Sequence, residues 1–388
     1  MTAFIPYGRQ SIDEADIAAV ESVLRSDWLT QGPSIPAFEQ EFARRCEARY
    51  AVAVCNATAA LHIACLAAGL GPGDRLWTTP NTFVASANCG RYCGADVDFV
   101  DIDPDSWCLD VDALALKLAA ARRAGTLPKV VVPVAFAGRS HDMKQLKQLS
   151  DEYGFTVIED ASHAVGASYD RRPVGCGEFA HMTVFSFHPV KIITTGEGGI
   201  VLTNDPACYE RLQGLRSHGI TRDEDRMESP SDGPWFYQMI ELGFNYRITD
   251  IQAALGLSQL KRLDGFLERR RALARRYCGL LKDLPLRLPQ LEPEGESAWH
   301  LFVVRLMPDR MKVSHREVFE ALRSAGIGVN LHYIPVHLQP YYRRLGFKPG
   351  DFPQSEAYYR EAISLPMYAG LTDEAQDRVV AELKRVLG

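Results

Sequence analysis

The sequence between residues 186 and 199 reads Ser186-Phe187-His188-Pro189-Val190-Lys191-Ile192-Ile193-Thr194-Thr195-Gly196-Glu197-Gly198-Gly199. An apolar run from Met182 to Phe187 leads into it, and a second run, Gly199 to Thr203, follows it. Both runs have the length of buried strands, so Lys191 is predicted to lie in a turn between two strands. A lysine partly desolvated in such a turn has a lowered pKa, and its neutral amine can form a Schiff base. The alternative is a solvated lysine in a hairpin loop, as most loop lysines are.

The segments before this turn alternate between strand and helix patterns. Strands are expected at residues 50–55, 75–78, 97–102, 129–136 and 155–158, with helices at residues 59–68, 84–92 and 141–153 between them. Repeated units of this kind predict an α/β fold with a mostly parallel sheet and helices on both of its faces. Ligands of such folds bind beyond the carboxyl ends of the strands.

Two of these strand ends carry candidate site residues. Asn56-Ala57-Thr58 leads from a strand into a helix of small residues, whose N-terminus would attract a phosphate. Asp160 follows the strand at 155–158 and is close to His163 in the sequence. A carboxylate in that place suits a pyridoxal cofactor, because it keeps the ring nitrogen protonated. Thr58 and Asp160 could instead be simple helix caps, and His163 a hydrogen-bonded loop residue.

The composition limits the classes of function. With 388 residues and 46% hydrophobic content, the chain is long enough for a large and a smaller domain. A net charge of −6 without a basic run argues against nucleic-acid binding. The most apolar region, residues 51–70, contains polar interruptions, so no membrane span is expected. No signal peptide is expected, and nine cysteines without a C-x-x-C pair suggest reduced thiols and a cytoplasmic location.

The remaining sequence predicts several helices and an exposed loop. Ser11-Ile12-Asp13-Glu14 is a capping-box pattern before a helix at residues 12–26, and a second helix is expected at 35–48. Residues 222–234 lack apolar periodicity and predict an exposed loop. A helix from about 250 to 281, broken near Gly265, carries Arg269-Arg270-Arg271, which we expect on its solvated face. A strand at 299–306 and helices at 314–325 and 373–387 predict a smaller C-terminal α/β domain.

The motifs described above resemble those of the nucleotide-sugar aminotransferases of the DegT/DnrJ type. The resemblance rests on Glu159 to Ala164, Phe185 to His188, Lys191 and Gly196 to Gly199, and it extends over nearly the whole chain through the further motifs at residues 29–32, 56–61, 78–88, 216–219, 243–247 and 331–335. It implies the aspartate-aminotransferase-like fold of the type I pyridoxal-phosphate enzymes. The large cofactor-binding domain would span residues 1–250, the smaller α/β domain residues 251–388, and the enzyme would be a homodimer.

The resemblance also implies a role for each matching residue. Lys191 would hold pyridoxal 5'-phosphate covalently, Asp160 would pair with its ring nitrogen, and His163 would lie near its hydroxyl edge. Phe83 would stack on the ring. The phosphate would be bound by Ala57, Thr58, Ser186 and, from the neighbouring subunit, Asn245. The site of the sugar nucleotide would be lined by Tyr7, Asp27, Trp28, Leu29, Thr30, Leu331, His332, Tyr333 and Ile334. Many relatives have serine or glycine at the position of Ala57, but a backbone N–H contact survives that change.

Within the family, the resemblance is nearest to the transaminases of pseudaminic acid biosynthesis. It implies transfer of an amine from an amino acid, expected to be L-glutamate, to C4 of a UDP-4-keto-6-deoxy-N-acetylhexosamine, without a metal. A perosamine-type or 4-amino-arabinose-type keto sugar stays open as the substrate. Related sugar dehydratases have histidine in place of the lysine, so Lys191 argues against that class. The presence of Lys191, Asp160 and Ser186 together argues against a non-catalytic binding protein.

Overall fold

The computed structural model describes residues 3–291 and 297–388. Its centre is a seven-stranded sheet in which five neighbouring strands are parallel, while β9 runs antiparallel to both of its neighbours. The sequence-based prediction of a mostly parallel sheet is therefore confirmed. The strand order across this sheet is β1 (Tyr50–Val54), β9 (Gly199–Thr203), β8 (Met182–Ser186), β5 (Thr156–Asp160), β4 (Val130–Val132), β2 (Arg75–Thr78) and β3 (Asp96–Phe99).

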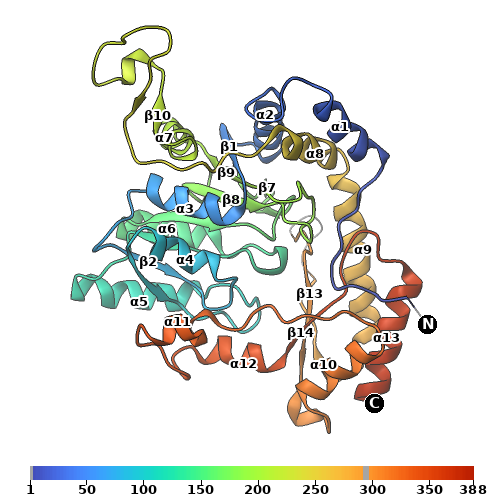
Figure 1. The fold of residues 1–388 in the computed structure, drawn as a ribbon. Helices are drawn as coiled ribbons and strands as arrows, with labels where there is room; N and C mark the ends of the chain where they lie inside the picture. The colour runs from blue at the N-terminus through green and yellow to red at the C-terminus, as the bar shows by residue number, and fades with distance from the viewer. Residues whose placement is uncertain (1–2, 292–296) are drawn as a thin grey trace.

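Helices cover both faces of the large sheet (Figure 1). Strand β4 shows how the two faces arise, since Val130 and Val132 belong to one core and Val131 to another. The first face packs against α3 (Ala57–Ala67), α4 (Ala85–Tyr92) and α7 (Pro206–Arg216). The second face packs against α5 (Val111–Ala124) and α6 (Met143–Tyr153), and beyond them against α2 (Ser34–Cys46) and α8 (Asp250–Leu260). Two short strands, β6 (Ser168–Tyr169) and β7 (Arg172–Pro173), form a separate hairpin.

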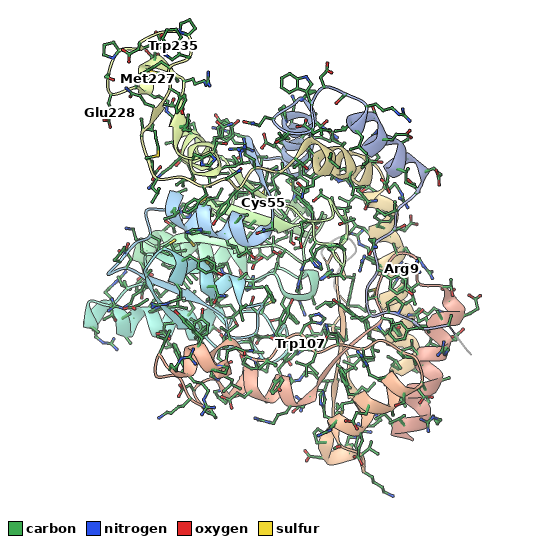
Figure 2. All side chains as sticks on the ribbon, in the orientation of Figure 1. Arg9, Cys55, Trp107, Met227, Glu228 and Trp235 are labelled. Atoms are coloured by element: carbon green, nitrogen blue, oxygen red, sulfur yellow. The ribbon has the colours of Figure 1, made fainter. Side chains whose placement is uncertain are left out.

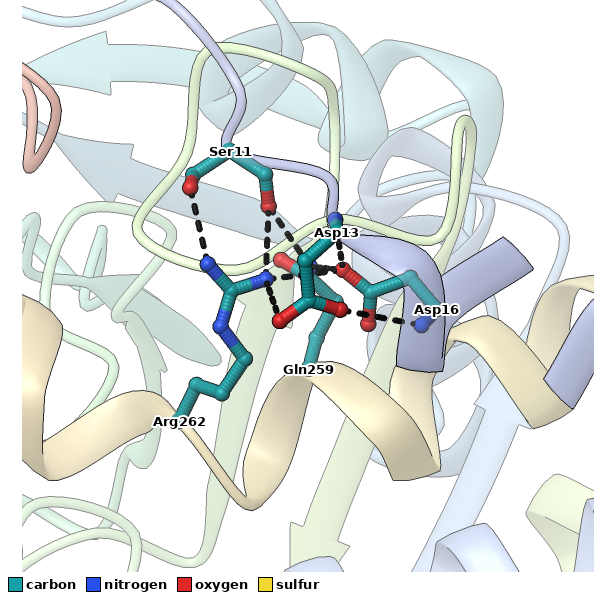
Figure 3. A network of polar contacts seen from close by, with 5 residues as sticks. All are labelled: Ser11, Asp13, Asp16, Gln259 and Arg262. Atoms are coloured by element: carbon teal, nitrogen blue, oxygen red, sulfur yellow. Dashed lines mark hydrogen bonds and ion pairs between the residues drawn. The ribbon is translucent and has the colours of Figure 1, made fainter. Parts of the chain in front are cut away.

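The first helix, α1 (Glu14–Leu24), begins later than the sequence pattern predicted. Its N-cap is Asp13, which forms a capping box with Asp16, so the prediction of Ser11 as the cap was wrong. The Ser11 hydroxyl instead accepts a hydrogen bond from the guanidinium of Arg262 at 2.9 Å (Figure 3). Arg262 and Gln259 both also bind the fully buried Asp16. This network fixes the N-terminal segment to the corner between α8 and the next helix.

The C-terminal part has its own core around a small antiparallel sheet. Its strands are β12 (Leu286–Arg287), β13 (Phe302–Leu306) and β14 (Ala362–Leu365), and the helices packed on them are α9 (Leu263–Leu281), α10 (His315–Ser324) and α13 (Asp373–Leu387). The break between α8 and α9 lies at residues 261–262, where Arg262 is held by the network above. It was predicted near Gly265, which lies inside α9.

The chain between the small-domain elements returns to the large sheet. The short helices α11 (Pro340–Arg343) and α12 (Pro353–Glu361) lie there, and the rings of Tyr342 and Phe352 pack edge-on against Phe99. Conversely, Ile5 near the N-terminus belongs to the C-terminal core. The domain boundary at residue 250 stays a prediction.

A hairpin projects from the body of the molecule beyond α7 (Figure 1). It consists of β10 (Ile220–Thr221) and β11 (Gln238–Met239), joined by a segment that contains a short 3-10 helix, η2 (Glu224–Arg226). Most of its residues are exposed, as predicted for residues 222–234. Within the part of the chain that the structure describes, no helix has both the length and the apolar character needed to cross a bilayer.

Candidate active site

A cavity of about 930 Å³ opens at the carboxyl ends of β5 and β8, where the sequence predicted the site. Residues from both parts of the chain line it. The predicted site residues that it brings together are Tyr7, Ala57, Thr58, Phe83, Asp160, His163, Ser186, Lys191, Leu331, His332 and Tyr333. Its volume is within the range of small-molecule sites.

Lys191 lies in the turn between the antiparallel strands β8 and β9 and is half-buried. Burial lowers the pKa of its amine to about 8, and the nearby Asp160 carboxylate opposes this shift in part. The turn is held by backbone hydrogen bonds, among them one from the Lys191 N–H to the His188 carbonyl at 2.8 Å. About a tenth of the amine is therefore neutral at pH 7, far more than for a solvated lysine, which favours its action as a nucleophile and base.

Asp160 is the last residue of β5 and is buried. Its Oδ2 accepts a hydrogen bond from the Ser86 hydroxyl at 2.6 Å, and its Oδ1 accepts one from the Ser162 N–H at 3.1 Å. Ser86 is in turn 2.7 Å from the hydroxyl of Thr82. The Ser86 hydroxyl has one proton and donates it to the carboxylate, so Thr82 must be the donor in the contact with Ser86. The two donors hold the carboxylate in one orientation inside the cavity.

His163 is buried beside this carboxylate and is neutral. Burial lowers its pKa well below the ordinary value, and the charge of Lys191 adds to this. Its Nδ1 accepts the Ala137 N–H at 3.3 Å, so the ring proton is on Nε2. That proton is donated to the phenol oxygen of Tyr333, 3.2 Å away. The tautomer of His163 and the position of Tyr333 are thus coupled.

The helix N-terminus at the other end of the cavity suits a phosphate. The N-cap of α3 is Asn56, which accepts the Ala59 N–H at 2.9 Å, so the alternative of Thr58 as the cap was wrong. The N–H groups of Ala57 and Thr58 have no acceptor within the helix. A side chain at Gly199 would place its Cβ 2.6 Å from the Ala57 nitrogen, so glycine is needed there for β9 to approach this turn.

The opposite wall of the cavity comes from the N-terminal segment and the C-terminal part. Tyr7 is half-buried, and its hydroxyl forms a hydrogen bond with Asn330. Its ring lies 5.5 Å, between centroids, from that of His332, whose Nδ1 is 2.8 Å from the Ser364 hydroxyl. A few polar side chains placed in this way in a cavity can orient a small ligand.

Six of the predicted site residues do not line this cavity of the single chain. Asp27, Trp28, Leu29, Thr30, Ile334 and Asn245 are all exposed. Asn245 lies at the base of the hairpin, where its backbone pairs with Ser217. The roles expected for these six residues stay predictions.

The structure brings into or next to the site further residues that the sequence did not mark as site residues, among them Ser86, Asn330 and His300. Ser86 holds Asp160, Asn330 holds Tyr7, and His300 lines the cavity beside His163. Ser86 and Asn330 each lie in or directly beside a motif noted above, so a polar residue there was the available signal. No local pattern marks His300.

The arrangement meets the requirements of pyridoxal phosphate. Lys191 has a lowered pKa, Asp160 is a buried and oriented carboxylate, and α3 offers an anion site at the far end of the same cavity. Among the described residues, no group of three or more His, Cys, Asp or Glu side chains is arranged to hold a metal ion. Fold and site together define a pyridoxal-phosphate-dependent enzyme of the α/β class.

The chain belongs to the DegT/DnrJ/EryC1/StrS aminotransferase family, whose model matches residues 10–384. It is 38% identical over 387 residues to the spore coat polysaccharide biosynthesis protein SpsC of Bacillus subtilis, covering 99% of this chain and 97% of that protein. Its fold is similar to Helicobacter pylori PseC, an aminotransferase involved in the biosynthesis of pseudoaminic acid. The TM-score is 0.89 and the identity 29%, with 99% of both chains covered.

A further similar structure is the putative sugar aminotransferase Spr1654 from Streptococcus pneumoniae in its PMP-form. The TM-score is 0.88 and the identity 30%, with 99% of this chain and 97% of that chain covered. The same protein has also been solved in a PLP-form. The protein is therefore a pyridoxal-phosphate-dependent sugar aminotransferase, which takes its amine from an amino donor and transfers it to a sugar.

Proposed function

We propose that the enzyme transfers the amine of L-glutamate to C4 of a UDP-4-keto-6-deoxy-N-acetylhexosamine, giving UDP-4-amino-4,6-dideoxy-N-acetyl-β-L-altrosamine for pseudaminic acid biosynthesis. The observation that carries the proposal is the single cavity of about 930 Å³ that joins Lys191 to Tyr7 and Asn330. It has room for a cofactor and a hexose at once. The similarity to PseC over 99% of both chains supports this choice of sugar.

The residues around Lys191 would divide the work as follows. When bound, pyridoxal phosphate supplies an electron-withdrawing ring that carries the amine from donor to sugar. The neutral amine of Lys191 takes a proton from the donor carbon and delivers one to C4 of the sugar. Asp160, held by Ser86 and Ser162, would keep the ring nitrogen of the bound cofactor protonated. Neutral His163 donates to Tyr333 and holds that phenol at the edge of the reacting centre.

The phosphate and the sugar would occupy opposite ends of the cavity. The N–H groups of Ala57 and Thr58, with the hydroxyl of Ser186, would hold the cofactor phosphate at the positive end of the α3 dipole. Phe83, whose ring is 58% exposed on the cavity wall, would stack on the cofactor ring. Tyr7, Leu331 and His332 would contact the sugar.

We also propose that the enzyme is a homodimer whose two sites are shared between the chains. Asn245 is exposed and does not line the cavity of its own chain. It lies at the base of the hairpin, whose far end carries Met227, Glu228 and Trp235 (Figure 2). Trp235 is 71% exposed and Leu242 74% exposed, which is unusual for large apolar side chains. A second copy packed against the hairpin would bury them and bring Asn245 to the partner's phosphate site.

The hypothesis of a cytoplasmic enzyme is supported by the state of its thiols. All nine cysteines lie within the described residues, and none forms a disulfide. Free thiols persist in a reducing compartment. We therefore propose that the enzyme acts in the cytoplasm.

A substrate panel tests the proposed sugar. The purified enzyme with L-glutamate is offered UDP-4-keto-6-deoxy-N-acetylhexosamines of both C5 configurations, GDP-4-keto-6-deoxymannose and UDP-4-keto-arabinose, and products are detected by mass spectrometry. The highest kcat/KM is expected for the UDP-N-acetyl sugar that leads to the altrosamine product. A preference for the GDP sugar would favour a perosamine-type role, and a preference for the pentose a 4-amino-arabinose-type role. Either result would reject the proposal.

A further inference from the structure

Arg270 occupies a core position on α9. The buried face of this helix consists of Leu263, Phe266, Leu267, Arg270, Leu273, Ala274, Tyr277 and Leu281, which is the spacing of a single helical face. Arg270 is only 2% exposed. The prediction that all three arginines at 269–271 lie on a solvated face was therefore wrong for Arg270, because the helical period turns its side chain inward. Its neighbour Arg269 lies at the surface and pairs with Asp373.

The buried guanidinium binds three backbone carbonyls. One terminal nitrogen, which carries two hydrogens, lies within hydrogen-bond distance of all three: 3.2 Å from the carbonyls of Trp299 and His300 and 3.1 Å from that of Met367, so one of its hydrogens is shared between two carbonyls. Within the described residues, no carboxylate forms an ion pair with it. A buried cation without a counter-ion is costly unless hydrogen bonds compensate it, and the Nε of Arg270 has no partner among the described residues, so the burial of this charge depends on the three carbonyls.

The carbonyls of Trp299 and His300 belong to a segment that packs against the His163 side of the cavity. Trp299 has a left-handed backbone with φ 49°, which a bulky residue adopts only when its surroundings hold it. A Cβ at Gly138 would lie 2.8 Å from the Trp299 nitrogen and 3.0 Å from the His163 carbonyl, so the two segments touch through their backbones. The ring of His300 then lies 4.4 Å, between centroids, from that of His163.

The carbonyl of Met367 belongs to a segment that contacts Tyr7, on the opposite side of the cavity. The Met367 N–H donates to the Tyr7 carbonyl at 2.9 Å, while the Met367 carbonyl accepts from Arg270. The same guanidinium therefore fixes His300 against His163 on one side and Met367 against Tyr7 on the other.

We infer that Arg270 is a positioning residue that sets the distance between the cofactor wall of the cavity, at His163, and the sugar wall, at Tyr7. The inference rests on the proposed function, because it assigns the two walls to the two ligands. Arg270 lines neither wall and acts through Trp299, His300 and Met367. The two hydrogens of its terminal nitrogen allow the side chain to donate to carbonyls of both segments at once.

The charge of Arg270 has a second, supporting effect. Burial lowers the pKa of His300 well below its ordinary value, and the positive charges of Lys191 and Arg270 add to that shift. His300 therefore stays neutral and does not compete with Lys191 for a proton. Its Nδ1 has no hydrogen-bond partner among the described residues, and its ring packs against that of His163.

The test compares Arg270→Met, Arg270→Lys and the matched control Arg269→Met, each as the full-length, cofactor-loaded enzyme. In Arg270→Met we expect KM for the keto sugar to rise and kcat to fall, with a combined loss in kcat/KM of roughly 100-fold, as for a displacement of about 1 Å at a reacting centre. Arg270→Lys keeps a cation with several donors and should recover part of this loss. Arg269→Met should match wild type in both constants.

Two readouts do not depend on turnover. Arg270→Met should weaken cofactor binding to the apo-enzyme, measured by quenching of tryptophan fluorescence, and shift the pH at which the absorbance of the bound cofactor changes. Arg269→Met should do neither. If Arg270→Met folds and equals Arg269→Met in KM, kcat, cofactor affinity and absorbance, the inference is wrong.

A second variant covers the case in which Arg270→Met does not fold. Arg270→Gln keeps an amide donor but is too short to reach both segments, so it should show the same rise in KM and the same absorbance change. Wild-type constants in a folded Arg270→Gln enzyme overturn the inference. Lys191→Ala is assayed in parallel, because turnover in that variant would reject the proposed function itself, whatever Arg270 does.

Discussion

The hydroxyl of Ser86 on α4 lies 2.6 Å from Oδ2 of Asp160 at the end of β5. The two residues are 74 positions apart in the sequence, and their contact joins the helix beside the cofactor wall to the carboxylate at its centre. Since Thr82 donates to Ser86, the chain from Thr82 to Asp160 is a directed series of hydrogen bonds.

Ser86→Ala removes the stronger of the two donors to Asp160. A hydrogen bond to a charged group contributes about 1.5–3 kcal/mol, so kcat/KM should fall by roughly 10- to 100-fold with a folded protein. Steady-state kinetics with the best sugar of the panel measure this. Thr82→Val is the matched control one step further away, and its loss should be smaller. Equal losses in both variants would contradict the directed series.

Asp160→Asn keeps the shape of the side chain but removes its charge. The ring nitrogen of the cofactor then has no anionic partner, and kcat should fall by roughly 100-fold or more. Single-turnover kinetics of amine transfer from L-glutamate isolate this step from product release. A turnover near that of wild type would show that Asp160 does not have the proposed role.

Lys191→Met should stabilise the apo-enzyme in a pH-dependent way. Burial lowers the pKa of Lys191 to about 8 in the folded state, whereas the ordinary value in an unfolded chain is about 10.4. The unfolded state therefore holds more protons between these values, so wild-type stability is reduced below pH 8 and recovers as the pH rises toward 10.4. The free energy of unfolding of the variant should exceed that of wild type by about 2 kcal/mol at pH 7 and by little at pH 10. The value at pH 7 is smaller than the full pKa shift would give, because the Lys191 side chain is only half-buried.

Urea unfolding at the two pH values measures this difference. Lys144→Met is the control, because Lys144 is a surface residue paired with Asp170 and should give no gain that depends on pH in this way. A stability gain for Lys191→Met that is the same at pH 7 and pH 10 would mean that Lys191 is not desolvated.

The sequence predicts the position of a residue where the pattern that determines it lies in the neighbouring residues, and fails where distant residues determine it. Lys191, Asp160 and the α3 N-terminus follow strands whose apolar runs are evident, so their gathering at one sheet edge could be predicted. Arg270 could not be placed correctly, because a run of three arginines indicates solvent and only the full stripe of α9 puts one of them in the core. The N-cap of α1 is Asp13 and not the predicted Ser11, because Ser11 binds Arg262, which is distant in the sequence.

The shared site predicts complementation between two inactive chains. Lys191→Ala and Asn245→Ala each impair every site of their own homodimer. In a heterodimer, one site draws intact Lys191 and intact Asn245 from different chains, while the other site carries both defects. After unfolding, mixing and refolding equal amounts, activity should recover to roughly a quarter of wild type, as random pairing into two-fold dimers requires.

Each variant refolded alone is the control for this mixing experiment, and native mass spectrometry counts the heterodimers. Heterodimers without recovered activity would place Lys191 and Asn245 in the site of the same chain. The hairpin would then need another explanation for its exposed Trp235.

We propose that Lys191 and its cavity move an amine from an amino acid to C4 of a UDP-keto sugar. The most direct measurement incubates the enzyme with ¹⁵N-labelled L-glutamate and the UDP-4-keto-6-deoxy-N-acetylhexosamine, and locates the label in the product by mass spectrometry and NMR. We expect ¹⁵N at C4 with wild-type enzyme, in amounts that match the 2-oxoglutarate formed, and none with Lys191→Ala. An unlabelled product, a label at another carbon, or labelled product from Lys191→Ala would contradict it.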